Sequence, residues 1–241
     1  MAAAASGKSG FSLVESLIAL TLFLFLFLAG IEIFGSARKT LAKLGEAQMI
    51  EEVVSAALDR IRADVRSAGR GLAGPPGSEI VECLEAAGGT LIIRSGEIST
   101  RLTADAAAGQ TFLAVSDGSD FQAGRAICVM DASKGETALI ASAGTSGISL
   151  ASPLSHAYRD GETSVVLVRE IAIYIDEARR VIRRKVDAGT GQPLLEDAGS
   201  FSFSIGPPYP VAAIAVASRL GKGEIHETSV HAPNAALAAL R

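Results

Sequence analysis

An unbroken apolar stretch near the start of the chain predicts a helix long enough to cross a membrane. Residues 17–28 read LIALTLFLFLFL, and no charged residue occurs between Glu15 and Glu32. Folded as a helix, residues 12–31 would be ~30 Å long, about the thickness of the hydrocarbon core of a bilayer. The segment contains no proline, and its one glycine, Gly30, lies near the end. We therefore expect a transmembrane helix.

The helical pattern continues beyond this run but becomes amphipathic. Apolar residues recur at intervals of three or four, as they do on one face of a helix. Two such sets occur, at positions 34, 37, 41 and 44 and at positions 50, 53, 54, 57, 58, 61 and 65. We expect this face to be buried under a folded domain. Glycines at 69, 71 and 74, followed by Pro75-Pro76, predict a helix end near residue 69 and a linker over residues 70–78.

From residue 79 onward the pattern changes to short β runs separated by Gly, Asp, Ser and Pro, the residue types that form turns. Residues 103–168 predict a compact β module, a small barrel or roll, inserted into the main sheet. The whole pattern predicts an α+β fold in which a long N-terminal helix packs on an antiparallel sheet. The expected strands are 80–84, 90–94, 98–102, 111–115, 126–130, 137–143, 147–150, 164–168, 170–175, 181–186, 201–205, 212–218 and 226–231, and the one later stretch with helical character is 234–240.

Charge and cysteine content narrow the function classes. The 241-residue chain has a net charge of −4, so it lacks the basic surface that nucleic-acid binding requires. Its two cysteines, Cys83 and Cys128, are too few to hold a zinc ion. They predict either a disulfide, if the domain faces an oxidising compartment, or two small buried apolar side chains. One short basic run fits a solvated strand or turn better than a phosphate site: Arg179, Arg180, Arg183, Arg184 and Lys185.

Candidate catalytic and ligand-binding patterns are weak. The three histidines, at 156, 226 and 231, form no H-E-x-x-H motif, and the chain has no G-x-S-x-G turn. Asp117, Asp120 and Asp131 lie in or beside loops, but they lack the order of a calcium loop and are expected to form turns. The G-x-G-x-x-G at residues 69–74 follows a helix instead of a strand, which a dinucleotide site requires. We therefore predict no catalytic residue, no cofactor and no metal.

Glu15 is the residue that the apolar stretch does not explain. A carboxylate in lipid costs several kcal/mol unless it is paired or lies near the interface. A secretory signal would have its small-residue cleavage site after the apolar run, whereas here Ser9-Gly10 precedes it. Removal of residues 1–10 would leave the helix in place and create a cationic amine at Phe11. That amine could neutralise Glu15 of the same chain or of a neighbouring chain packed in parallel with an axial offset.

The segment KSGFSLVE at residues 8–15 resembles the processing site of type IV pilins and of the pseudopilins of type II secretion. The family pattern is a basic leader that ends in Gly, followed by Phe-(Ser/Thr)-Leu-(Ile/Val)-Glu and an apolar helix. The resemblance implies that Gly10 precedes the bond cut by a prepilin peptidase. It implies that Phe11 becomes the N-methylated terminus and that Glu15 sets the registry of subunits in a filament. It also implies a pilin-like fold.

Residues 58–69 and 168–205 are similar to the PilW-like minor pilins and the J-type pseudopilins. The shared features are the end of the helix, an L-x-R-type strand, a Q-P-L turn at residues 192–194 and a closing Phe-rich strand that contains Phe201 and Phe203. An Arg usually precedes the Asn near the end of the last strand of that branch, whereas Pro233 precedes Asn234 here. The resemblance implies a large head that initiates or caps a filament with other minor pilins or pseudopilins as partners.

These inferences divide the chain into a leader (1–10), a membrane and assembly helix (11–33), its amphipathic continuation (34–69), a linker (70–78) and a β-rich head (79–241). The protein is then expected in the bacterial inner membrane as a single-pass protein, with a cytoplasmic N-terminus and a periplasmic or extracellular head. The alternative is a membrane-anchored periplasmic binding protein or hydrolase that uses the helix only as a tether. The sequence leaves open whether the machine is a pilus, a secretion system or a DNA-uptake apparatus.

Overall fold

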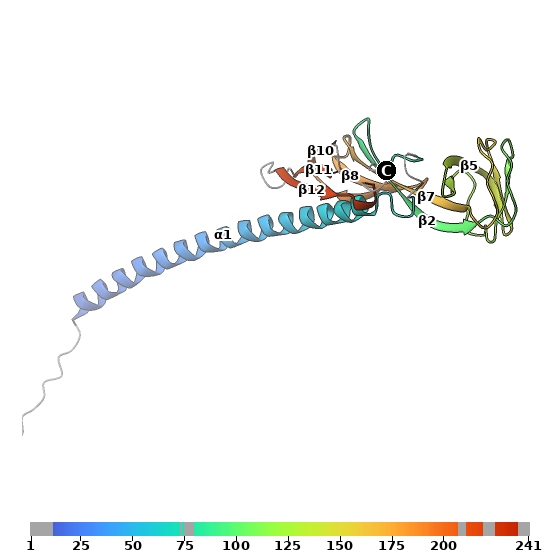
Figure 1. The fold of residues 1–241 in the computed structure, drawn as a ribbon. Coiled ribbons are helices and arrows are strands. Elements are labelled where there is room, and N and C mark those ends of the chain that lie inside the picture. Colours follow the sequence, from blue (N-terminus) through green and yellow to red (C-terminus); the bar gives the residue numbers. More distant parts are fainter. Residues whose placement is uncertain (1–11, 73, 75–79, 207–210, 219–224, 236–241) are drawn as a thin grey trace, which may run out of the picture. The chain divides into compact units, whose positions relative to one another are not determined.

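The structure is a computed structural model that describes residues 12–72, 74, 80–206, 211–218 and 225–235. The chain divides into two compact units, residues 1–49 and residues 50–241. One helix, α1 (Leu13–Ser67), begins in the first unit and ends in the second. All of the described strands belong to the second unit (Figure 1).

The C-terminal end of α1 is where the glycine pattern predicted it. The helix ends at Ser67, and Gly69 follows with φ = 74°, a left-handed backbone conformation that glycine adopts without steric cost. The Gly69 N–H donates a hydrogen bond to the carbonyl of Arg94 in the sheet, at 2.9 Å. The end of the helix is thus fixed to the sheet through the backbone.

Of the two predicted apolar sets, the second is buried from Val54 onward, while its Val53 is 53% exposed. Val54, Ile61 and Val65 lie in the core, whereas Leu41 and Leu44 are 67% and 56% exposed. Leu41 and Leu44 belong to the first unit, in which the apolar face of α1 is exposed. The three-to-four spacing indicates that a helix has an apolar face, but it does not indicate what covers that face.

The second unit contains twelve strands within the described residues, and their bounds differ from the predictions at several points. The runs predicted at 90–94 and 98–102 are one strand, as are those at 164–168 and 170–175. The strand predicted at 80–84 begins only at Leu84. The strands are β1 (Leu84–Ala87), β2 (Thr90–Arg101), β3 (Phe112–Ala114), β4 (Ala126–Met130), β5 (Gly135–Gly144), β6 (Gly147–Leu150), β7 (Ser164–Asp176), β8 (Val181–Val186), β9 (Gln192–Leu195), β10 (Ala198–Gly206), β11 (Val211–Ser218) and β12 (Ile225–His231).

Strand β9 replaces the turn expected at residues 192–194. Pro193 pairs with Arg183 of β8, and β9 has no other strand partner in the described structure. Proline is tolerated at such an edge because its missing N–H would not face a neighbouring strand. At the C-terminal end, residues 233–235 are helical, and the rest of the helix expected at 234–240 lies outside the described residues.

The strands form two antiparallel sheets. The larger has nine strands in the order β1-β2-β7-β4-β5-β6-β3, with β8 paired to β7 and β9 paired to β8. The smaller has the order β10-β11-β12. Strands β2 and β7 pair over most of their lengths, and a β-bulge between Gly96 and Ile98 interrupts their register (Figure 1). The observed fold is thus α+β with antiparallel sheets, as predicted.

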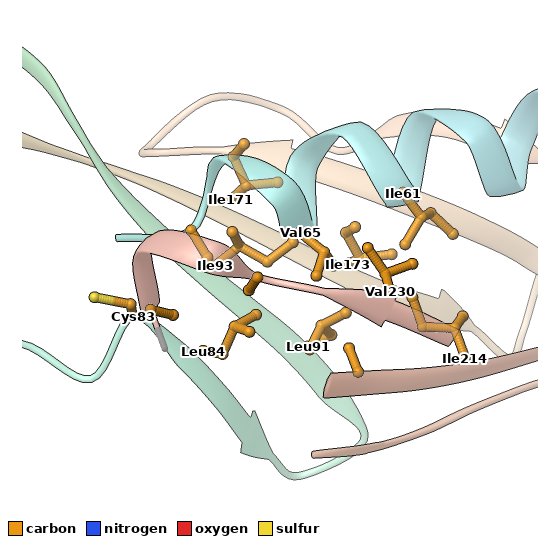
Figure 2. Packing of buried hydrophobic residues seen from close by; sticks show 14 of the residues in the cluster. Ile61, Val65, Cys83, Leu84, Leu91, Ile93, Ile171, Ile173, Ile214 and Val230 are labelled. Carbon is orange, nitrogen blue, oxygen red and sulfur yellow. The ribbon is translucent and has the colours of Figure 1, made fainter. Parts of the chain in front are cut away.

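The main hydrophobic core lies between α1 and both sheets. Ile61 and Val65 of α1 pack with Leu91 and Ile93 of β2 and with residues of β7, β11 and β12 (Figure 2). Burying an Ile or Leu side chain contributes about 1.5–3 kcal/mol, so this cluster is a principal source of stability for the unit. We call it the main core. Its fully buried members with the largest side chains are Ile61, Leu91, Ile93, Ile173, Ile182 and Ile214.

A second cluster, which we call the module core, consists of residues between Ile98 and Leu167. Strand β4 contributes to both cores, because Ile127 and Val129 face the module core while Cys128 and Met130 face the main core. Such burial on both faces explains why β4 reads AICVM, a continuous apolar run without alternation. Strands β4 and β7 therefore join the two cores.

Candidate assembly helix

Glu15 is located in the first turn of α1 and is exposed. Backbone hydrogen bonding starts at once, with the Ser16 N–H donating to the Ser12 carbonyl at 3.1 Å. Asp and Glu are favoured near a helix N-terminus because the helix dipole is positive there. This position contributes about 0.3–1 kcal/mol, well below the several kcal/mol that a carboxylate costs in lipid. The helix dipole alone therefore does not explain an acid at the start of this apolar run.

The apolar side chains that follow Glu15 are exposed in the structure. Phe25, Leu26 and Phe34 are between 67% and 76% exposed, and none of the most apolar part of α1 is buried. Phe23 and Phe27 stack on each other at 6.1 Å between ring centroids. By length and composition, α1 is compatible with a single membrane span. The polar side chain in this run is accommodated locally, since the Thr21 hydroxyl donates to the carbonyls of Leu17 and Ile18.

The other two residues of the predicted processing site lie outside the described residues. Gly10 and Phe11 both precede Ser12, where the description of the chain begins.

The two cysteines are both buried in the main core, at 6% exposure for Cys83 and 1% for Cys128. No disulfide joins them in the structure. The Cys83 thiol donates a hydrogen bond to the Val81 carbonyl at 3.4 Å. Burial, together with the electrostatic influence of Cys83, raises the pKa of Cys128 to about 12. The burial agrees with the expectation of two small apolar side chains and leaves the predicted pairing as a proposal.

The candidate calcium ligands form turns instead. Asp117 Oδ1 accepts hydrogen bonds from the N–H and the hydroxyl of Ser119. Asp131 Oδ1 accepts the same two bonds from Ser133 and a third from the Lys134 N–H. Within the described parts of the chain, no three His, Cys, Asp or Glu side chains are placed to hold a metal ion.

A groove of about 710 Å³ lies beside the large sheet, lined by residues 80–82, 122–126 and parts of β2, β5 and β7. Its arginines are paired with carboxylates. Arg94 contacts Glu170 at 2.9 Å and Glu85 at 2.8 Å, and Arg125 contacts Asp187 at 3.1 Å. Both arginine side chains are therefore already engaged with carboxylates of the protein.

Sequence reasoning missed the role of Glu97, which lies in the β-bulge of β2. Its carboxylate contacts Arg125 at 2.7 Å and also accepts a hydrogen bond from Arg169. Burial opposes ionisation, but hydrogen bonds from the two arginines prevail and lower the pKa of Glu97. Bulges re-aim side chains in this way. The only sequence signal was Gly96 beside Glu97 within an otherwise regular strand pattern.

We expected the basic run at residues 179–185 to be solvated, but one of its arginines is nearly buried. Arg184 is only 11% exposed at its side chain and contacts Asp64 of α1, which is 8% exposed. Arg60, which precedes Asp64 by one helical turn (i,i+4), lies farther away, with 3.9 Å between Nε and Oδ1. Asp64 is thus satisfied mainly by a residue 120 positions away in the sequence, which helical spacing does not reveal.

Searches against known protein families, curated protein sequences and solved structures gave no match to this chain.

Proposed function

We propose that this protein is a filament subunit of the pilin type, a minor pilin or J-type pseudopilin that helps to initiate or cap a type IV pilus or a type II secretion pseudopilus. The single observation that carries the proposal is Glu15 in the first turn of an exposed apolar helix, as the last residue of a segment that resembles a prepilin processing site. In this proposal, a prepilin peptidase cuts after Gly10, and Phe11 becomes the methylated terminus.

The mechanism is electrostatic. An isolated carboxylate among lipid chains is unfavourable by several kcal/mol, and a cation beside it removes much of that cost. If parallel helices pack with an axial offset, the terminal amine of one chain lies beside Glu15 of the next. The acid then favours assembly over the isolated chain, while the head selects which subunits stack together.

The experiment that tests this proposal replaces Glu15 and follows three readouts in the native host. Glu15→Gln and Glu15→Ala are expected to insert into the membrane and to lose the leader as the wild type does. Both are expected to be incorporated poorly into the filament and to reduce piliation or secretion. Glu32→Gln is the matched control, because it removes the other acid that borders the apolar run. Normal incorporation of the Glu15 variants would contradict the proposal.

The alternative function is a tethered binding protein or hydrolase, for which the 710 Å³ groove would be the site. It predicts that Glu15 is dispensable and that removal of a groove residue, such as Glu170, abolishes activity. Glu170 is an informative choice because its side chain is 46% exposed although it pairs with Arg94. Full assembly of Glu170→Gln together with failure of Glu15→Gln supports the filament proposal.

A further inference from the structure

The two cysteines belong to segments that are far apart in the sequence but meet in the main core. Cys83 immediately precedes β1, and Cys128 is in the middle of β4. The chain contains only these two cysteines, so an intramolecular disulfide has one connectivity. Strand β4 alternates between the two cores, and this alternation turns Cys128 toward the main core together with Met130.

The segment before β1 passes over the hairpin formed by β4 and β5. A Cβ built on Gly135 would lie 2.1 Å from Ile80 Cδ1 and 3.2 Å from Met130 Cβ, so Ile80 packs directly on this hairpin. Residues 80–82 also line the same groove as Arg125 and Ala126, the residues at the start of β4. This path brings the chain past β4 immediately before Cys83.

The backbone then fixes Cys83 at the edge of β2. The Arg94 N–H donates to the Cys83 carbonyl at 2.9 Å, which extends the β1–β2 ladder by one residue. In Figure 2 the Cys83 sulfur projects from the end of the cluster, away from Leu84 and Leu91. The electrostatic influence of Cys83 on Cys128 also requires the two thiols to be near each other, because such effects weaken with distance.

We propose that Cys83 and Cys128 form an intramolecular disulfide when the head folds on the oxidising side of the membrane. This inference rests on the proposed function, which places the head outside the cytosol. The bond would fasten the segment that leads into β1 onto β4, across one end of the groove. It would also link the main core to a strand shared with the module core.

The chemistry is thiol–disulfide exchange with a disulfide-bearing oxidoreductase of the envelope. One cysteine thiolate attacks the oxidoreductase disulfide and forms a mixed disulfide. The thiolate of the second cysteine then attacks the sulfur of the first cysteine in that mixed disulfide. This forms the intramolecular disulfide and releases the reduced oxidoreductase. The two thiols lose two protons and two electrons, and the electrons reduce the oxidoreductase. Because Cys128 is 1% exposed and has a pKa of about 12, the exchange is expected during folding, before Cys128 is buried.

The test uses the full-length chain, purified in detergent from untreated cells. A parallel sample of spheroplasts is treated with protease, and digestion of the head there shows that it lies outside the cytosol. The protein is denatured and treated with N-ethylmaleimide, so that burial cannot protect a thiol. We expect no modified thiol before reduction and two after it. We also expect a proteolytic peptide that contains Cys83 to be linked to one that contains Cys128. Cys83→Ser is the control, and its remaining thiol should be modified without reduction.

Two modified thiols in the untreated wild type would overturn the disulfide, as would a cysteine linked to another chain. The intact mass of the alkylated protein, measured on the same sample, also reports whether residues 1–10 have been removed. A trimmed chain with two modified thiols would overturn the disulfide but not the proposed processing. An untrimmed chain with linked peptides would overturn the processing but not the disulfide.

Discussion

Arg184 of β8 clamps the end of α1 to the large sheet through Asp64. Arg184 Nε donates to Asp64 Oδ2 at 2.6 Å and Nη2 donates to Oδ1 at 3.0 Å, which is the two-pronged geometry that favours arginine over lysine. Both side chains are nearly buried. The pair therefore fixes the position of the last turns of the helix on β8.

Loss of one partner should be costly because the other charge remains buried. We expect Asp64→Ala to lower the unfolding free energy by about 3–5 kcal/mol. Asp59→Ala is the matched control on the same helix, and its exposed pair with Arg62 should contribute less than about 1 kcal/mol. Chemical denaturation of the full-length protein in detergent, followed by circular dichroism, measures both. If Asp64→Ala lowers the unfolding free energy by no more than Asp59→Ala does, the Asp64–Arg184 pair does not stabilise the fold.

Gly69 should tolerate substitution less well than Gly88, although both have positive φ, at 74° and 55°. A Cβ on Gly69 would lie 2.8 Å from the Ala235 backbone N, whereas a Cβ on Gly88 meets nothing within 4 Å. Gly88→Ala should cost about 1–2 kcal/mol from backbone strain alone. Gly69→Ala should cost more, because the segment around Ala235 must also move. The comparison is made by thermal unfolding, and similar melting temperatures would mean that Ala235 is not held against the helix end.

Stability should depend on pH through Glu97. Its pKa is lower in the folded state than its ordinary value of 4.5, so ionised Glu97 stabilises the fold at neutral pH. This contribution should be lost as the pH falls below 4.5 and through the folded pKa. We expect Glu97→Gln to cost about 1.5–3 kcal/mol at pH 7 and progressively less toward acid pH.

Denaturation of wild type and Glu97→Gln across pH 3–7 checks this prediction. Glu51→Gln, an exposed acid on α1, serves as the control and should follow the wild type. If the unfolding free energies of wild type and Glu97→Gln differ by the same amount over this whole range, the charge of Glu97 does not contribute to stability.

Truncation of a residue in one core should destabilise that core and leave the other core protected from hydrogen exchange. Ile148 and Ile173 are both fully buried, one in each core, and truncation of either to alanine should cost about 2–5 kcal/mol. In hydrogen exchange, Ile148→Ala is expected to deprotect β3 and β6 first, and Ile173→Ala is expected to deprotect β7, β8 and the end of α1 first. Uniform deprotection in both variants would show that the two cores unfold as one.

The sequence predicted the helix, its end and most of the strands because these follow from local periodicity and turn residues. Its errors have long-range causes. The sequence predicted two strands in place of β2 because the residues of the bulge at Glu97 resemble a turn in the local pattern. In the structure, pairing with β7 continues on both sides of the bulge. Strand β9 was missed because Pro193 argues against a strand unless it lies at an edge.

The same limit applies to the candidate site. Glu15 stood out because a single acid in an apolar run is chemically unusual within the sequence itself. Partners such as Asp64 and Arg184 lie 120 positions apart and are brought together only by the fold. The sequence also could not predict which part of the apolar face of α1 is buried. The apolar spacing is the same over residues 34–44, which are exposed, and over residues 54–65, which contribute to the main core.

The most direct test of the central claim is the intact mass and N-terminal sequence of the protein isolated from assembled filaments. The account predicts a chain that begins at Phe11, carries one added methyl group and retains Glu15. Recovery of functional, assembled protein that still carries residues 1–10 would contradict the account, because no amine would then be available at Phe11 to pair with that acid.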